Sequence, residues 1–191
     1  MNIELVEWQK LSDKNGLCYP WWTHPFLEVM EGWDLSEKYM LELGAGLGTA
    51  WLRDKCKWVD SVDASPEWAE RAEQYCQYHD KLNGQISCEL IADGVEGGWE
   101  QYKKLIPENV KYDVIINDDA YRTEICQVAV DYLKANGGGI LINENWKQSF
   151  VWISPKAEEI MQPYEAMVFE QHDHKDNDGV NKWKTAVWNI K

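Results

Sequence analysis

The stretch LELGAGLG, residues Leu41–Gly48, determines the fold that we expect for this chain. The run Tyr39–Leu43 has the apolar character of a buried strand, and it stops at a cluster of glycines placed at alternate positions. Glycines in such a loop let the backbone pass close to a ligand and turn sharply into the N-terminus of a helix. The spacing is G-x-G-x-G rather than the G-x-G-x-x-G of dinucleotide-binding enzymes, and an acid, Glu42, stands two residues before the first glycine. The stretch therefore predicts a strand, a ligand-binding loop and a helix, in that order.

Outside this stretch, short apolar runs alternate with helical segments, which is the pattern of a parallel sheet covered by helices. We expect strands at residues 39–43, 58–63, 86–91, 112–117, 139–143, 166–171 and 184–190. We expect helices at residues 25–32, 50–56, 66–79, 99–105, 122–135 and 155–161. Only a polar turn separates the last two strands, so they are expected to pair as an antiparallel hairpin. The prediction is a doubly wound, seven-stranded α/β sheet that is mostly parallel and ends in that hairpin.

Composition limits the class of protein. The chain has 191 residues, of which 45% are hydrophobic and 27% are charged, as in an ordinary soluble domain with its own core. No apolar run approaches the ~20 residues of a membrane helix, so we expect no membrane partner. The first residues carry acids where a signal peptide carries positive charge, which indicates a cytoplasmic location.

Charge and cysteine usage disfavour further classes of protein. The chain has 19 basic and 33 acidic residues, a net charge of −14, whereas proteins that bind nucleic acid neutralise phosphates with Lys and Arg. Nucleic acid is therefore an unfavoured partner. Five scattered cysteines without a C-x-x-C pair argue against a disulfide framework and a zinc site. Most of the 12 tryptophans are expected to pack in the core or in a homodimer, and the alternative is an aromatic surface for a substrate ring.

The glycine stretch Leu41–Gly48 resembles motif I of the class I S-adenosylmethionine-dependent methyltransferases, which have a Rossmann-like fold. In that family the glycine loop packs against the methionine part of the cofactor, and the acid before it helps to orient the loop and the amino group. The resemblance continues along the chain. It implies that Asp63 binds the ribose hydroxyls, that Asp93 receives the adenine amino group, and that Asp118 lies near the methyl-bearing sulfur. The turn at 133–138, LKANGG, is similar to the family's Leu-Lys-Pro-Gly-Gly turn.

The resemblance implies S-adenosylmethionine as the cofactor, held at the carboxyl edge of the sheet where open α/β folds bind ligands. The implied cofactor-binding residues are Glu42, Gly44, Ala45, Gly46, Asp63, Ala64, Asp93, Gly94 and Asp118. It also implies a single methyltransferase domain over residues 1–191. In that domain we expect residues 1–35 to form a leader or lid segment and residues 36–191 to form the cofactor-binding core.

The acceptor is indicated by the segment DDAYR at 118–122. It lacks the Pro-Pro pair of the Asp/Asn-Pro-Pro-Tyr motif in amino-group methylases of DNA and protein, and it resembles the Asp-x-x-x-Arg segment of small-molecule O-methyltransferases. The implied acceptor is a small molecule with a hydroxyl group. A hydroxyl nucleophile needs a base, and the candidates are Asp118 and Glu144. Metal-dependent members have Asp-Asn after the fifth strand, but this chain has Asn143-Glu144-Asn145, so no metal is expected.

Three alternatives stay open at this point. The chain could be a nucleic-acid or protein N-methyltransferase, a non-catalytic partner subunit that binds S-adenosylmethionine, or an enzyme that breaks down or rearranges that cofactor. The first is disfavoured by the missing Pro-Pro pair and by the net charge of −14.

Overall fold

The computed structural model describes residues 13–91, 96–146, 155–172 and 182–191. Its strands are β1 (Tyr39–Leu43), β2 (Trp58–Asp63), β3 (Gly84–Cys88), β4 (Val114–Asn117), β5 (Gly139–Glu144), β6 (Ala166–His172) and β7 (Lys182–Ile190). Its helices are α1 (His24–Glu31), α2 (Gly48–Lys55), α3 (Pro66–Tyr78), α4 (Gly98–Lys103), α5 (Arg122–Ala135) and α6 (Pro155–Met161).

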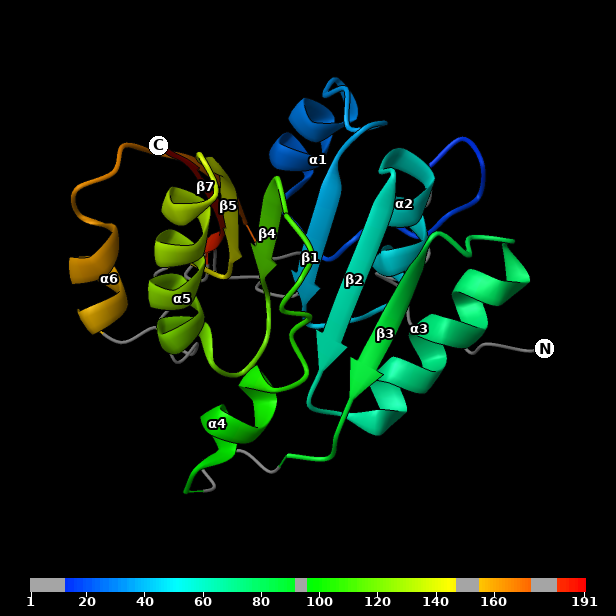
Figure 1. The fold of residues 1–191 in the computed structure, drawn as a ribbon. Helices are drawn as coiled ribbons and strands as arrows, with labels where there is room; N and C mark the ends of the chain where they lie inside the picture. The colour runs from blue at the N-terminus through cyan, green and yellow to red at the C-terminus, as the bar shows by residue number, and fades with distance from the viewer. Residues whose placement is uncertain (1–12, 92–95, 147–154, 173–181) are drawn as a thin grey trace.

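The seven strands form one sheet in the order β3-β2-β1-β4-β5-β7-β6. Strands β1 to β5 pair in parallel, whereas β7 pairs antiparallel with both β5 and β6. Figure 1 shows the arrowheads of β1, β2, β3 and β4 pointing to the same edge of the sheet. The predicted doubly wound sheet with an antiparallel C-terminal hairpin is therefore confirmed. Because the chain turns back between β3 and β4, a crevice is expected at the carboxyl ends of β1 and β4.

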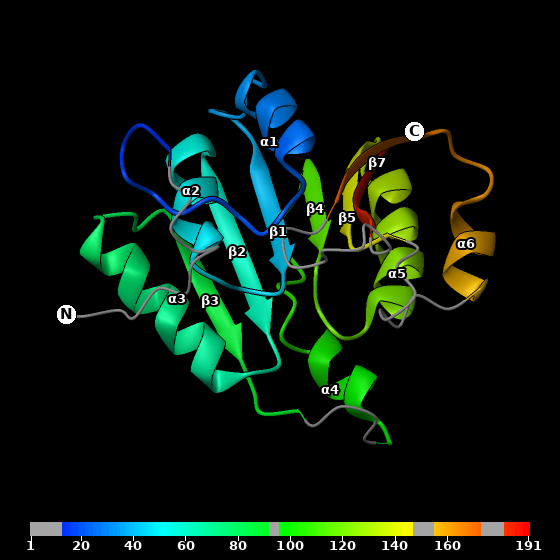
Figure 2. The same cartoon turned by 180° about the vertical axis from the view of Figure 1, so that it is seen from behind.

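The central strands of the sheet are buried on both faces because helices cover both sides, and alternate residues of each strand point to opposite faces. Met40 and Ile116 pack on one face with residues of α1, α2 and α3. Their neighbours Leu41 and Ile115 pack on the other face with residues of α4, α5 and α6. Figures 1 and 2 show the two sides of this arrangement. The central strands are thus held rigidly, and their ends provide fixed positions for a site.

Hydrogen bonds attach the segment ahead of α1 to α3 and to β7. The backbone N–H of Cys18 donates to Tyr75 Oη on α3 at 3.1 Å. The backbone N–H and the hydroxyl of Thr23 both donate to Thr185 Oγ1 on β7, at 3.1 and 3.0 Å. Figure 2 shows this blue segment passing across the α2 side of the sheet on its way to α1. Residues 20–22 between the two attachments therefore have a defined path.

Most predicted boundaries agree closely with the structure, and the largest difference is at the third strand. We predicted a strand at 86–91, but β3 runs from Gly84 to Cys88. Among the described strands it pairs only with β2, and their ladder ends where Asp63 lies opposite Cys88. The apolar residues that follow, Leu90 and Ile91, lie beyond the ladder, and the backbone N–H of Ile91 donates to the carbonyl oxygen of Ala64 at 3.2 Å, just after β2 ends. In the described residues, no helix combines the length and the apolar character that crossing a membrane requires.

Candidate active site

The three glycines of the loop after β1 have different structural roles. Gly44 has φ +103, and a Cβ atom there would lie 2.6 Å from the carbonyl oxygen of Asp118. A Cβ on Gly48 would lie 2.5 Å from Cα of Pro20, in the segment ahead of α1. A Cβ on Gly46 would meet nothing within 4 Å. The first and third glycines thus permit close backbone contacts, whereas the second leaves open space above the loop.

Glu42, on β1, stabilises this loop through hydrogen bonds. Its side chain is buried, with 4% of the residue exposed, and Oε2 accepts hydrogen bonds from Thr49 Oγ1 at 2.7 Å and Ser61 Oγ at 2.6 Å. Thr49 Oγ1 in turn accepts from the backbone N–H of Gly46 at 3.1 Å. The other oxygen, Oε1, has no hydrogen-bond partner among the residues that the structure describes. Burial raises the pKa of Glu42 to about 7, against the opposing effect of the two hydroxyl donors.

Asp63 is the last residue of β2 and is also buried. Its Oδ1 accepts from the backbone N–H of Ser65 at 2.7 Å. Ser65 is the N-cap residue of α3 and Pro66 occupies the first turn. Burial raises the pKa of Asp63 to about 7, and the negative charge of Asp119 adds to this effect. Its carboxylate is thus fixed at the end of the strand next to the glycine loop.

Asp118 directly follows β4 and forms an ion pair with the first residue of α5. Its Oδ1 lies 2.7 Å from Nη2 of Arg122, and Nη1 of the same guanidinium donates to the carbonyl oxygen of Asp119 at 2.8 Å. Asp118 Oδ2 has no hydrogen-bond partner in the described part of the chain. Burial raises the pKa of Asp118 to about 6, while Arg122 opposes the rise. The arrangement leaves one carboxylate oxygen available to a ligand.

Glu144, the second candidate base, is placed differently. It is the last residue of β5, beside the end of β4 as expected, but its side chain is fully buried. Its Oε2 accepts from Thr185 Oγ1 at 2.6 Å, and Thr185 also accepts the two hydrogen bonds from Thr23. Burial raises its pKa well above the ordinary value, and the charge of Asp118 adds to the rise. Glu144 therefore joins β5 to β7 and to the segment before α1.

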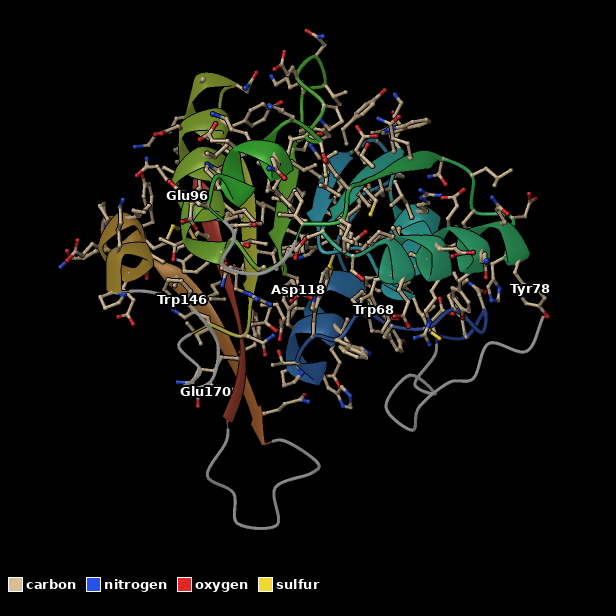
Figure 3. The ribbon with its side chains drawn as sticks, turned by 90° about the horizontal axis from the view of Figure 1, so that it is seen from below. Trp68, Tyr78, Glu96, Asp118, Trp146 and Glu170 are labelled. Atoms are coloured by element: carbon tan, nitrogen blue, oxygen red, sulfur yellow. The ribbon has the colours of Figure 1, made fainter. Side chains whose placement is uncertain are left out.

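The carboxyl ends of the strands surround a cavity of about 560 Å³. Figure 3 looks onto this edge of the sheet, with Asp118 and, from α3, Trp68. Seven of the implied cofactor-binding residues line the cavity: Glu42, Gly44, Ala45, Gly46, Asp63, Ala64 and Asp118. Glu144 is not among the lining residues. The expected residues Asp93 and Gly94 lie outside the described part of the chain.

Trp68 is a lining residue that was not singled out from the sequence. Trp68 lies in the first turn of α3, and its ring meets that of Trp21 edge to face at 5.9 Å. Trp21 is 39% exposed, whereas Trp22 is 2% exposed and packs on Phe26 with ring centroids 5.4 Å apart. Asn145 also lines the cavity and has φ +57, a conformation that is uncommon for a residue other than glycine. The position of Trp68, five residues after the acid that ends β2, is the signal that could have identified it.

The charge around the cavity is strongly unbalanced. Its described lining contains the carboxyl groups of Glu42, Asp63, Asp118 and Asp119, and the guanidinium of Arg122 is the only cationic side chain there. Among the described residues, no group of three or more His, Cys, Asp or Glu side chains could hold a metal ion. Carboxylates that are gathered in a partly desolvated cavity favour a ligand with positive charge.

No known protein-family profile and no curated protein sequence matches the chain. Solved structures do match. The precorrin 8w decarboxylase of Methanobacterium thermoautotrophicum has a TM-score of 0.58 and 14% identity, and the alignment covers 98% of this chain and 100% of that one. The O-methyltransferase of Bacillus cereus, in complex with S-adenosylhomocysteine (SAH), has a TM-score of 0.56 and 15% identity, with 81% and 74% covered. The N-methyltransferase NodS of Bradyrhizobium japonicum has a TM-score of 0.55 and 14% identity, with 87% and 91% covered. At these identities the likeness establishes a shared fold.

Proposed function

We propose that this protein is an S-adenosylmethionine-dependent methyltransferase that acts on a hydroxyl group of a small molecule. The observation that carries the proposal is the cavity at the carboxyl edge, where the glycine loop and the acids that end β2 and β4 meet. Solved proteins of the same fold include methyltransferases for different acceptor atoms, so the choice of acceptor depends on the groups inside this cavity.

The cavity residues fit the cofactor. The open space above Gly46 leaves room for a ligand against the loop. Oε1 of Glu42 is available to a cationic group such as the cofactor's ammonium. The Asp63 carboxylate stands at the cavity wall beside the N-terminus of α3, where it can accept hydrogen bonds from ribose hydroxyls.

When bound, the cofactor would supply a methyl group on a sulfonium, which an acceptor oxygen would take while the electron pair of the C–S bond stays on sulfur. The protein positions the reacting groups, excludes water and takes up a proton. Asp118 Oδ2 is the candidate acceptor of that proton, while Arg122 holds Oδ1. Glu144 is buried behind Thr185, so we assign the role of base to Asp118 alone.

Two measurements on the same variant test this function. Asp118→Asn should lower methyl transfer by ~100-fold or more, the usual effect of losing a positioned base, and leave the affinity for SAH nearly unchanged. Asp131→Asn is the matched control because Asp131 is an exposed acid on α5 that pairs with Gln127. Full activity of Asp118→Asn would contradict the role of this carboxylate.

The cofactor itself is tested by calorimetry with SAH and with NAD. We expect binding of SAH and no binding of NAD. If NAD binds as tightly as SAH, or if labelled methyl groups are transferred to nucleic acid or protein but to no small hydroxyl compound, the proposed function is wrong.

A further inference from the structure

The cavity retains an excess of negative charge even when it holds the proposed cofactor. Its described lining has four carboxyl groups and one guanidinium. S-adenosylmethionine carries a sulfonium, an ammonium and a carboxylate, so it brings a single net positive charge. At least part of the excess negative charge therefore remains to attract the second ligand. This attraction is strong because the carboxyl groups are partly removed from water.

The one cationic side chain in the described lining is not available to neutralise an anionic acceptor. The side chain of Arg122 is 11% exposed and is bound to Asp118 Oδ1 at 2.7 Å and to the carbonyl oxygen of Asp119 at 2.8 Å. Turning the guanidinium toward an anion would leave the partly buried Asp118 carboxylate without its ion-pair partner, which disfavours that movement. An acceptor with a carboxylate or a phosphate group is therefore disfavoured.

The cavity also offers groups that suit a cation. Trp21 and Trp68 line it with their rings edge to face, and Trp21 keeps 39% of its surface exposed, whereas the Trp68 ring already lies against the Arg71 guanidinium, 4.8 Å from the ring centroid. The face of a tryptophan ring attracts an ammonium group. Asp119 adds a carboxylate that Tyr102 orients through a hydrogen bond of 2.7 Å to Oδ2. The partly exposed ring of Trp21 beside these carboxylates forms a suitable environment for an organic ammonium.

We propose that the methyl acceptor is a small molecule that carries a positively charged amino group in addition to its hydroxyl, and that the cavity rejects carboxylated and phosphorylated acceptors. This inference rests on the proposed function, because it assigns the ligand that shares the cavity with the cofactor. It makes the charge of the acceptor, rather than its size, the main determinant of selectivity.

Three compounds with the same phenol ring test the inference: tyramine, which is cationic, tyrosol, which is neutral, and 4-hydroxyphenylacetate, which is anionic. Binding of each to the protein saturated with SAH is measured by calorimetry at pH 7.5. We expect tyramine to bind at least about tenfold more tightly than tyrosol, and 4-hydroxyphenylacetate to bind most weakly. The preference for tyramine should decrease at high salt. Equal or tighter binding of the anion, or no binding of any of the three, overturns the inference.

Two pairs of variants locate the effect in the cavity. Asp119→Asn should reduce the preference for tyramine several-fold, whereas Glu28→Gln, which removes an exposed charge on α1, should not. Trp21→Leu should weaken tyramine binding, and Trp21→Phe should retain most of it because a ring remains. If Asp119→Asn and Trp21→Leu both leave the preference unchanged, the inference is wrong.

The SAH titration separates the two proposals. A protein that does not bind SAH contradicts the proposed function itself. A protein that binds SAH and prefers the anionic compound contradicts only the assignment of acceptor charge.

Discussion

Replacing the first and the second glycine of the loop by alanine should have opposite consequences. In Gly44→Ala the new Cβ would lie 2.6 Å from the Asp118 carbonyl oxygen, at a residue with φ +103. In Gly46→Ala the new Cβ would project into open space in the cavity. The first substitution should therefore affect folding stability, and the second should affect ligand binding.

The magnitudes follow from these contacts. A side chain in the left-handed region costs ~1–2 kcal/mol, and a forced shift in a packed region costs ~1–3 kcal/mol, so Gly44→Ala should destabilise the fold by ~2–5 kcal/mol. For a chain of this size that corresponds to a decrease in Tm of about 5–15 °C. Gly46→Ala carries neither of these costs, and the alanine also reduces the conformational freedom of the unfolded chain. The free energy of unfolding of Gly46→Ala should therefore change by less than ~1 kcal/mol.

The assay is urea unfolding followed by tryptophan fluorescence, combined with calorimetry of SAH binding on both variants. We expect Gly46→Ala to keep the unfolding midpoint and to weaken SAH binding by about tenfold or more, since the methyl group occupies ligand space. Two results would refute the reasoning. One is a Gly44→Ala variant as stable as the original protein, and the other is a Gly46→Ala variant that is destabilised but binds SAH normally.

Three further predictions concern buried polar groups. Glu42, Asp63 and Asp118 have pKa values of about 7, 7 and 6 in the folded protein, above their ordinary values, so the folded state takes up protons more readily. The stability that these raised pKa values contribute is greatest at low pH and is lost as the pH rises through 6–7. Tm should therefore decrease between pH 5 and 8, and it should decrease less steeply in Asp63→Asn. Asp63→Ala should weaken SAH binding by ~2–3 kcal/mol in calorimetry, as expected for charged hydrogen bonds, and an unchanged Kd would assign the ribose to another residue. Thr185→Val should lower the free energy of unfolding by ~1–3 kcal/mol because Glu144 loses its hydroxyl donor, while Thr185→Ser should remain within about 1 kcal/mol in urea unfolding.

The sheet could be predicted well because its signals are local. The run Tyr39–Leu43 and the helix 122–135 were predicted with the boundaries that the structure has. Each is defined by its own apolar pattern and by glycines that end it. The third strand was predicted too far along the chain, because its length depends on where β2 ends and not on its own apolar residues.

The two candidate bases show what could not be predicted from local sequence patterns. Both acids stand at the ends of neighbouring strands, and the sequence does not distinguish them. In the structure, Asp118 lines the cavity while Glu144 is covered and bonded to Thr185. Thr185 lies 41 residues further along the chain, on a strand that pairs antiparallel with β5. The burial of Glu144 is thus decided by a partner that its local sequence does not contain.

The sequence by itself determined the order of strands and helices, the glycine loop, and the placement of acids after the second and fourth strands. These features depend on residues close to one another in the chain, whose backbone preferences and apolar periodicity act locally. Only the tertiary structure decided that Trp21 and Trp68 meet at the cavity and that Arg122 is committed to Asp118 and Asp119. The reason is physical: the contact between Trp21 and Trp68 depends on how the segment ahead of α1 crosses the sheet. The sheet itself forms from strands that lie far along the chain.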